Sequence, residues 1–200
     1  MSKSYSINEI FYSLQGEGMR AGTANVFIRF AGCNLTCKME SHGFDCDTEF
    51  VAHRSMTSDQ IMTEVLERAG TCRNVIFTGG EPLLQLDAEL INIFESDVWY
   101  LCVETNGSKP LPEARLDWIT VSPKVAEHAV RVGKANEVKY VRADRQPIPQ
   151  PHCKADHYLI SPAYSPEGLQ TKDLAWCMKL VLDNPIWRLS MQQHKIWKIR

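Results

Sequence analysis

The sequence predicts an α/β fold in which a mostly parallel sheet forms a partial, open (β/α) barrel. Short apolar, β-branched runs alternate with segments of helical periodicity, which favours parallel strands joined by crossover helices. Four of these runs end in Gly-rich or polar clusters, as expected where ligands gather at the carboxyl ends of strands. The chain has 200 residues, whereas a closed barrel of eight units needs about 250. We therefore expect an open barrel of reduced size.

The strands are predicted from runs that are rich in apolar and β-branched residues and bounded by turn residues. In chain order the predicted strands are Ala24–Phe30, Asn74–Phe77, Val98–Val103, Trp118–Val121, Glu137–Val141, His157–Ile160 and Trp187–Met191.

Three segments between these runs have the spacing of amphipathic helices. Thr57 and Gln60 form a capping box ahead of an apolar stripe that starts at Ile61. A second helix is predicted from about Asp87 to Ser96. In the third, which starts after Ser165 or Thr171, one face carries Leu174, Cys177, Met178 and Val181.

Composition and charge exclude several classes of protein. No repeat or low-complexity tract marks a boundary, so we expect one domain over residues 1–200. Lys and Arg total 22 against 24 Asp and Glu, and a net charge of -2 creates no field that would attract nucleic acid or an anionic membrane. No apolar run is long enough to span a bilayer, and the first residues lack the core of a signal peptide. We expect a cytoplasmic protein.

The cysteines fall into two groups. Cys33, Cys37 and Cys46 lie in a turn-rich segment directly after a predicted strand. Soft thiolates select zinc or iron-sulfur clusters. Three cysteines suffice for a 4Fe-4S cluster with one open iron, whereas structural zinc needs a fourth ligand, for which His42 is available. Both sites remain possible from the spacing alone. The scattered cysteines are expected to pack as small apolar residues: Cys72, Cys102, Cys153 and Cys177.

Two glycine-containing motifs fit close contact between backbone and a ligand. Thr78–Pro82 (TGGEP) follows a predicted strand, and Gln15–Gly18 (QGEG) lies ahead of the first predicted strand. Glycine allows close approach and positive φ. Taken alone, each motif could equally be an ordinary surface turn.

Further motifs extend this pattern along nearly the whole chain: Asn8–Gly18, Phe27–Leu35, Cys46–Thr48 (CDT), Thr78–Pro82, Glu104–Gly107, Val121–Lys124 and Trp187–Lys195. Together they resemble the radical S-adenosylmethionine (SAM) superfamily and, within it, the family of 7-carboxy-7-deazaguanine synthases. Two features depart from the family pattern. Eight residues separate Cys37 from Cys46, where two are usual, and Ser161 stands where relatives often have Gln.

The resemblance implies a 4Fe-4S cluster and SAM as cofactors. The cluster would be held by Cys33, Cys37 and Cys46. The family pattern assigns contacts with SAM to Gly80, Glu104, Asn106, Ser122, Pro123, Lys124, Ser161, Pro162, Ala163 and Tyr164. It also makes Thr48 a ligand of Mg2+, an ion that prefers oxygen donors.

The implied reaction converts 6-carboxy-5,6,7,8-tetrahydropterin to 7-carboxy-7-deazaguanine with loss of ammonia. Arg29 suits the substrate carboxylate because its guanidinium is planar and always charged. The resemblance assigns the substrate to Leu14, Gln15, Gly16, Glu17, Arg29, Thr78, His194 and Arg200. The C-terminal tail is expected to close the active site, with the Arg200 carboxylate as an acceptor for the pterin.

The resemblance also implies an electron donor such as flavodoxin and a homodimer. Two alternatives remain, one within the superfamily and one from the residues alone. One is a radical SAM activating enzyme that makes a glycyl radical on a partner protein, although such enzymes lack the QGEG and CDT motifs. The other is a zinc-stabilised binding module built from the three clustered cysteines and His42.

Overall fold

The computed structural model describes residues 3–46, 48–94, 97–165 and 167–200. The strands are β1 (Ser4–Leu14), β2 (Ala24–Phe30), β3 (Arg54–Thr57), β4 (Asn74–Gly79), β5 (Tyr100–Thr105), β6 (Trp118–Val121), β7 (Lys134–Arg142), β8 (Lys154–Pro162), β9 (Tyr164–Ser165), β10 (Gly168–Leu169) and β11 (Trp187–Leu189). The helices are α1 (Met39–His42), α2 (Ser58–Ala69), α3 (Ala88–Asn92), α4 (Thr171–Asp183) and α5 (Gln193–Trp197), with 3-10 turns at Pro82–Leu84 and Glu127–Ala129.

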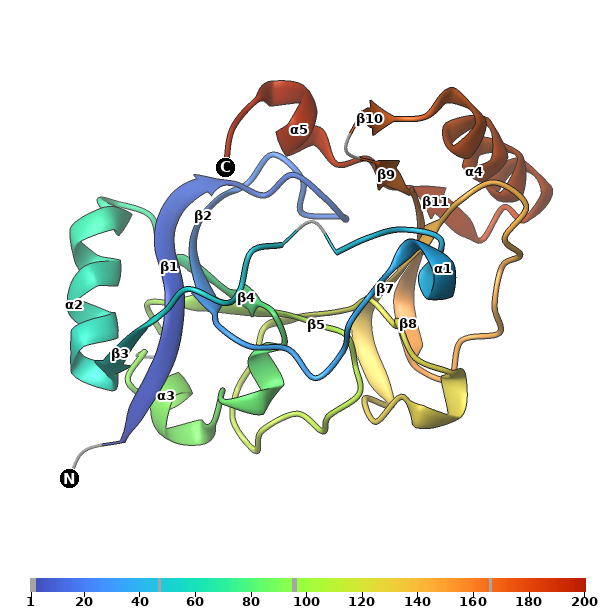
Figure 1. The fold of residues 1–200 in the computed structure, drawn as a ribbon. Helices are drawn as coiled ribbons and strands as arrows, with labels where there is room; N and C mark the ends of the chain where they lie inside the picture. The colour runs from blue at the N-terminus through green and yellow to red at the C-terminus, as the bar shows by residue number, and fades with distance from the viewer. Residues whose placement is uncertain (1–2, 47, 95–96, 166) are drawn as a thin grey trace.

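In the described residues, nine strands form one open sheet in the order β11-β8-β7-β6-β5-β4-β2-β1-β3. Within this sheet, among the described residues, the neighbouring pairs from β11 to β2 are all parallel, and β1 pairs antiparallel with β2 and β3. β9 and β10 form a separate antiparallel pair. The sheet curves, and the segment that carries α1 crosses in front of it (Figure 1). This architecture confirms the predicted α/β fold with a partial, open barrel.

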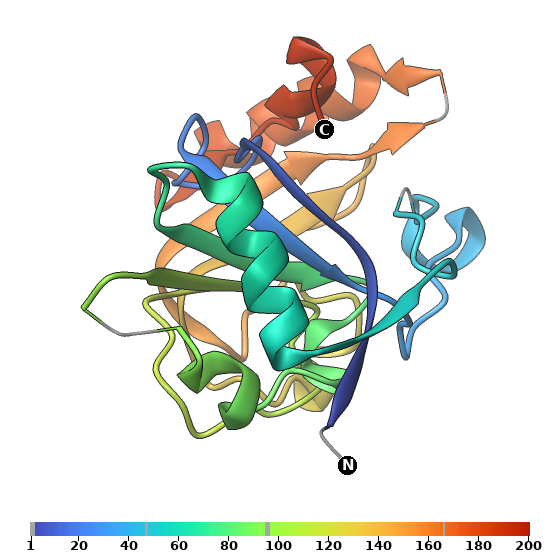
Figure 2. The same ribbon diagram turned by 90° about the vertical axis from the view of Figure 1, so that its left-hand side faces the viewer.

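The two faces of the sheet have different surroundings. On the outer face, Ile28, Phe77 and Val103 belong to a core that also includes residues of α2 and α3. Figure 2 shows α2 lying across the strands on this outside, and α4 packs on β8 and β11. On the inner face, Phe27 and Ile76 form an apolar floor with Phe11 and Cys102.

Side chains alternate along a strand, so every second residue returns to the inner face. Two positions beyond Phe27 and Ile76 come Arg29 and Thr78, and two positions beyond Cys102 comes Glu104. A polar layer therefore lies above the apolar floor, near the carboxyl ends of the parallel strands. This is where the fold class predicts the functional site.

The helix predictions are confirmed, with differences in length. α2 begins with the predicted capping box, in which the Thr57 side chain accepts from Gln60 N and the Gln60 side chain accepts from Thr57 N. α4 begins at Thr171, within the predicted range. α3 ends at Asn92, short of the predicted end at Ser96, which lies outside the described residues.

Two strands of the nine-stranded sheet, β1 and β3, were not predicted from the sequence, and neither was the short pair β9 and β10. β1 lacks a regular alternation because a bulge between Ile7 and Glu9 shifts its register against β2. As a result, Ile7 and Ile10, which are three positions apart, both belong to the outer core, whereas Phe11 faces the inner floor. β3 has four residues, of which Met56 alone is buried, too few to give a periodic signal.

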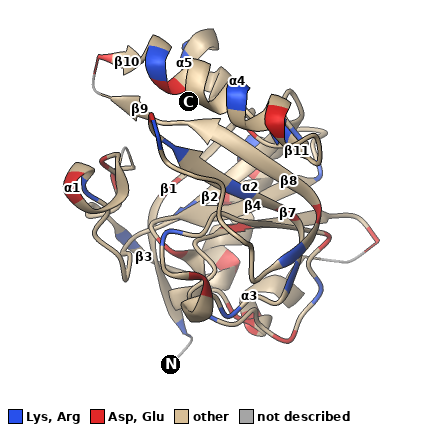
Figure 3. Ribbon diagram, turned by 90° about the vertical axis from the view of Figure 1, so that its right-hand side faces the viewer, with Lys and Arg blue, Asp and Glu red and all other residues tan. Residues whose placement is uncertain are grey.

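Within the described ranges, no helix is both long and apolar enough to cross a membrane. Figure 3 shows Lys and Arg interspersed with Asp and Glu on the side it presents.

Candidate active site

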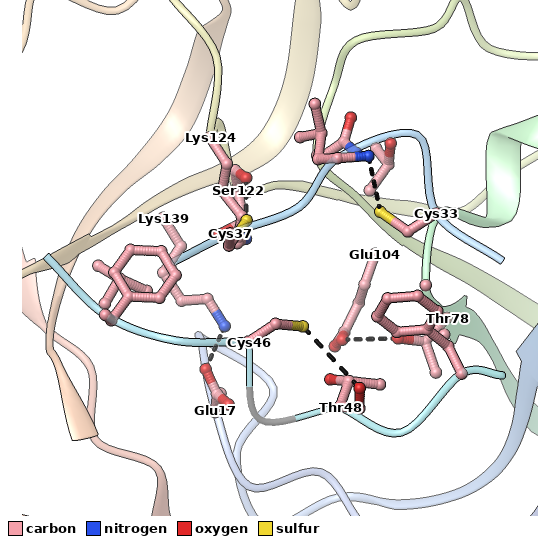
Figure 4. A pocket seen from close by; sticks show the side chains of 18 of the residues that line it. Glu17, Cys33, Cys37, Cys46, Thr48, Thr78, Glu104, Ser122, Lys124 and Lys139 are labelled. Carbon is pink, nitrogen blue, oxygen red and sulfur yellow. Dashed lines mark hydrogen bonds and ion pairs between the residues drawn. The ribbon is translucent and has the colours of Figure 1, made fainter. Parts of the chain in front are cut away.

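The three clustered cysteines line one cavity (Figure 4). Cys33 follows β2 directly, and its sulfur accepts a hydrogen bond from Leu35 N at 3.4 Å. The longer spacing between Cys37 and Cys46 is absorbed by α1, and Cys46 N donates to Cys37 O at 3.3 Å. The inserted residues therefore form a loop whose two ends are joined by this hydrogen bond, and the thiols of Cys37 and Cys46 both remain at the cavity. The middle residue of the CDT triplet, Asp47, lies outside the described residues.

The donor set fits a cluster better than a single zinc ion. Both ring nitrogens of His42 are engaged elsewhere, Nε2 with Lys124 O at 3.1 Å and Nδ1 with Ser41 Oγ at 2.7 Å. Among the described residues, no three His, Cys, Asp or Glu side chains converge on a point that could hold one metal ion. Zinc needs four ligands around one point, whereas in a 4Fe-4S cluster each thiolate binds a different iron. Three thiols spread around a cavity suit the second arrangement.

The remaining cysteines lie apart from this cavity. Cys102, Cys153 and Cys177 are buried in the apolar clusters. Cys72 is partly buried, and its thiol lies 3.3 Å from Ala24 O, to which it donates. Their positions agree with the expected packing role.

The same cavity has a polar wall made by Asn106, Ser122 and Lys124, and Figure 4 shows Ser122 and Lys124 beside Cys37. Lys124 Nζ donates to Ser122 Oγ at 3.1 Å, and burial lowers the pKa of this ammonium. Gly80 forms part of the same rim, and a Cβ there would lie 2.0 Å from Gly32 O. The glycine is required because the loop that carries Cys33 passes directly over it.

Glu81 holds this rim in place, although the sequence analysis assigned it no separate role. The carboxylate accepts from Thr105 Oγ1 at 2.6 Å, Asn106 N at 2.7 Å and Leu83 N at 3.0 Å. The side chain is fully buried, and burial raises its pKa. These bonds tie the TGGEP loop to the end of β5.

Some of the residues expected to contact SAM are only partly brought together at this cavity. Pro162 and Tyr164 line the thiol cavity. Ser161 and Ala163 are buried behind it, with Ala163 N bonded to Arg142 O at 2.9 Å. Pro123 is also buried and is not part of the lining among the described residues.

A second cavity adjoins the first and collects the residues expected to bind the substrate. Its lining includes Leu14, Gln15, Gly16, Glu17, Arg29, Thr78, His194 and Arg200. Gln193 N donates to Gly16 O at 2.8 Å, and His194 packs against Gly16. Figure 1 shows α5 and the C-terminus beside the connection from β1 to β2. The tail thus covers one side of this cavity.

Arg29 and Arg200 share one carboxylate at the outer end of the second cavity. Glu9 accepts from Arg29 Nε at 3.0 Å and from Arg200 at 3.0 Å. Ser13 Oγ also donates to the Arg200 main-chain oxygen at 2.8 Å. Arg29 makes this ion pair through Nε, and a guanidinium suits an anionic ligand because it can bind a carboxylate through two parallel N–H groups.

Five residues line both cavities: Glu17, Thr48, Thr78, Glu104 and Gln192. Glu104 accepts from Gln15 Nε2 at 2.5 Å and from Thr78 Oγ1 at 3.4 Å. Burial raises the pKa of the Glu104 carboxyl. Molecules bound in the two cavities would meet across this shared wall.

Lys139 and Gln192 are site residues that the sequence analysis did not identify. Lys139 forms an ion pair with Glu17, and Gln192 Nε2 donates to the same carboxylate at 3.0 Å. Burial raises the pKa of Glu17, but the Lys139 charge and these hydrogen bonds outweigh burial and bring it to about 2. The sequence contains one indication that Lys139 belongs to a site: Glu137 and Lys139 carry opposite charges on the same face of an otherwise apolar strand.

Comparisons with known proteins also relate this chain to radical SAM enzymes. The model of the radical SAM superfamily matches residues 27–143. A 7-carboxy-7-deazaguanine synthase from Bacteroides thetaiotaomicron is 42% identical over 196 residues, covering 97% of this chain and 98% of the relative. The enzyme of that name from Bordetella pertussis is 39% identical over 214 residues, covering 96% and 97%. The crystal structure of QueE from Escherichia coli superposes with a TM-score of 0.71 at 25% identity, covering 96% of this chain and 95% of that one.

Proposed function

The chain belongs to the 7-carboxy-7-deazaguanine synthase family of the radical SAM superfamily, and we propose that its two cavities convert 6-carboxy-5,6,7,8-tetrahydropterin to 7-carboxy-7-deazaguanine with loss of ammonia. The product belongs to 7-deazapurine biosynthesis, of the kind that leads to queuosine. The observation that carries this proposal is the shared wall, which sets a thiol-lined cavity directly beside a cavity with guanidinium groups.

In this proposal the first cavity holds the cofactors. Cys33, Cys37 and Cys46 bind three irons of a 4Fe-4S cluster. When bound there, the cluster and SAM supply an electron and a 5'-deoxyadenosyl radical, while the protein supplies position and electrostatics. Ser122 and Lys124 offer a hydroxyl and an ammonium suited to the ribose and carboxylate of SAM.

The first cavity offers further contacts to SAM. Asn106 offers an amide from the same wall, and Tyr164 borders the adenine. We expect Ser161, Ala163 and Pro123 to act through the backbone positions of their neighbours, because their side chains are buried behind the lining.

The second cavity holds the pterin. Arg29 binds the substrate carboxylate through a charge-assisted hydrogen bond. Gln15 and His194 offer hydrogen-bonding groups to the amino-pyrimidinone edge, and a site that is selective for a pterin must satisfy those donors and acceptors. Glu17 and Glu104 add acceptors at the wall between the cavities.

Thr48 is proposed as the protein ligand of Mg2+. Its side chain lies where both cavities meet and also borders the pocket beside Glu9 and Glu49. Mg2+ prefers oxygen ligands and keeps several waters or substrate atoms. The substrate carboxylate beside Arg29 can complete such a shell.

Further properties follow from the family as proposals. Residues 1–200 form one radical SAM domain whose tail closes the active site. The enzyme works in the cytoplasm, where thiols stay reduced and able to bind iron. A flavodoxin-like protein delivers the electron, and two copies form a homodimer.

The test is anaerobic turnover by the reconstituted protein with SAM, dithionite and the carboxylated tetrahydropterin, followed by mass spectrometry. We expect 7-carboxy-7-deazaguanine to form without any added protein partner. A glycyl-radical activating enzyme would form no such product, and a zinc-stabilised module would be colourless and would leave SAM intact.

A further inference from the structure

Lys139 is a buried cation in the interior of the barrel. Its side chain is 10% exposed and that of its ion-pair partner Glu17 is 16% exposed. Glu104 and Glu137 are also electrostatic partners of this ammonium. Glu137 is held separately by Thr120 Oγ1 at 2.9 Å and Met19 N at 2.8 Å. Lys139 is therefore a buried cation with three carboxylates as electrostatic partners.

The Glu17 carboxylate has a partner on each side. One oxygen faces Lys139, and the other accepts from Gln192 Nε2 at 3.0 Å. Gln192 directly precedes Gln193, whose N–H bonds to Gly16 O at 2.8 Å. A continuous chain of polar contacts thus runs from β7 through Glu17 to the start of the tail.

From this geometry, and resting on the proposed function of the second cavity, we propose that Lys139 is a positioning residue that holds the Glu17 carboxylate at the wall between the cavities and thereby keeps the tail closed over the pterin. Lys139 lines the first cavity and is absent from the lining of the second among the described residues. It acts on the pterin through Glu17 and Gln192, whereas Arg29 and His194 line the pterin cavity themselves.

The physical reason is that a buried carboxylate needs a compensating charge. Without Lys139, Glu17 would either take up a proton or turn toward water, since an unpaired buried charge is strongly unfavourable. A protonated or displaced Glu17 is a weaker acceptor for Gln192. The tail then loses one of the contacts that fix its first residue.

The experiment compares K139M, which keeps the length and removes the charge, with K139R, which keeps the charge. K134M is the matched control, because Lys134 begins the same strand and is exposed. The probe is 6-carboxypterin, a stable fluorescent analogue of the substrate, titrated against each protein without turnover. Hydrogen–deuterium exchange of residues 192–200 measures closure of the tail independently.

We expect K139M to weaken binding of 6-carboxypterin about tenfold and to speed exchange of the Gln193 amide, with K139R in between and K134M like the wild type. Unchanged binding together with unchanged exchange in K139M would overturn the proposal, and so would weaker binding with the tail still protected. If K139M fails to fold, the double variant E17Q/K139M removes both buried charges. It should fold and show the same fast exchange, and a protected tail in that variant would also overturn the proposal.

Failure of the proposed function has a different signature. If the wild-type protein does not bind 6-carboxypterin at all, the substrate assignment fails. The exchange experiment still decides whether Lys139 holds the tail.

Discussion

Replacing Gly16 by alanine should displace the tail without disturbing the fold. A Cβ at Gly16 would lie 2.3 Å from His194 Nδ1 and 2.7 Å from the His194 backbone N. Ordinary contacts at such a position lie between 3.4 and 4 Å, so the tail must retreat by about 1 Å. The backbone φ at Gly16 is not in the left-handed region, so alanine itself causes no backbone strain.

The cost can be worked out from the contacts that are lost. The hydrogen bond from Gln193 N to Gly16 O, 2.8 Å long, contributes about 1 kcal/mol. Displacement of His194 removes a second polar contact of similar size from the pterin cavity. Since about 1.4 kcal/mol corresponds to a factor of ten, we expect the KM for the pterin to rise by a factor of roughly 5 to 30.

The assay measures the KM for the pterin, SAM cleavage without pterin, and the melting temperature. Gly133→Ala is the matched control, because its Cβ would meet nothing within 4 Å. We expect Gly16→Ala to raise KM and to leave uncoupled SAM cleavage largely intact. A variant with lowered melting temperature but normal KM would show that the tail is only a packing element and would refute the reasoning.

The remaining predictions concern the cofactor site and pH. Cys37→Ala should lose iron and turnover while Cys177→Ser keeps its colour; a full cluster in Cys37→Ala, seen by iron analysis and absorption near 400 nm, would contradict the ligand set. Gly80→Ala should lower the affinity for SAM at least tenfold, measured by equilibrium binding, because its Cβ would clash with the loop that carries Cys33. An affinity equal to that of the wild type would show that the loop tolerates a Cβ at this position. Thr48→Val should still cleave SAM yet form product slowly with little response to added Mg2+; undiminished stimulation would exclude Thr48 as a ligand. Glu17 has a folded pKa of about 2 against an unfolded value of 4.5, so its stabilising effect is present above pH 4.5 and is lost as the pH falls toward 2. The melting temperature of E17Q apoprotein should therefore fall less steeply between these pH values than that of the wild type. An equal fall in both proteins would assign the pH dependence to other groups.

Much of the fold and site could be predicted from the sequence because the signal was local. The parallel strands are short β-branched runs, and their Gly-rich or polar ends mark the cavity edges. β1 was not predicted because its bulge breaks the alternation of apolar and polar residues, and β3 was not predicted because it has only four residues. Lys139 was not identified because a charged residue in a strand is usually solvated, even where an opposite charge such as Glu137 lies on the same face. Only the folded sheet brings Lys139 to Glu17, 122 positions away in the chain.

In the proposed reaction, a radical generated in the thiol-lined cavity abstracts a hydrogen atom from a pterin in the adjoining cavity. The most direct measurement is turnover with the tetrahydropterin deuterated at C6 and C7, its two saturated ring carbons, followed by mass spectrometry of 5'-deoxyadenosine and product. We expect deuterium to appear in 5'-deoxyadenosine as 7-carboxy-7-deazaguanine forms. Cleavage of SAM without transfer of deuterium, or without the deazaguanine product, would contradict the proposed reaction.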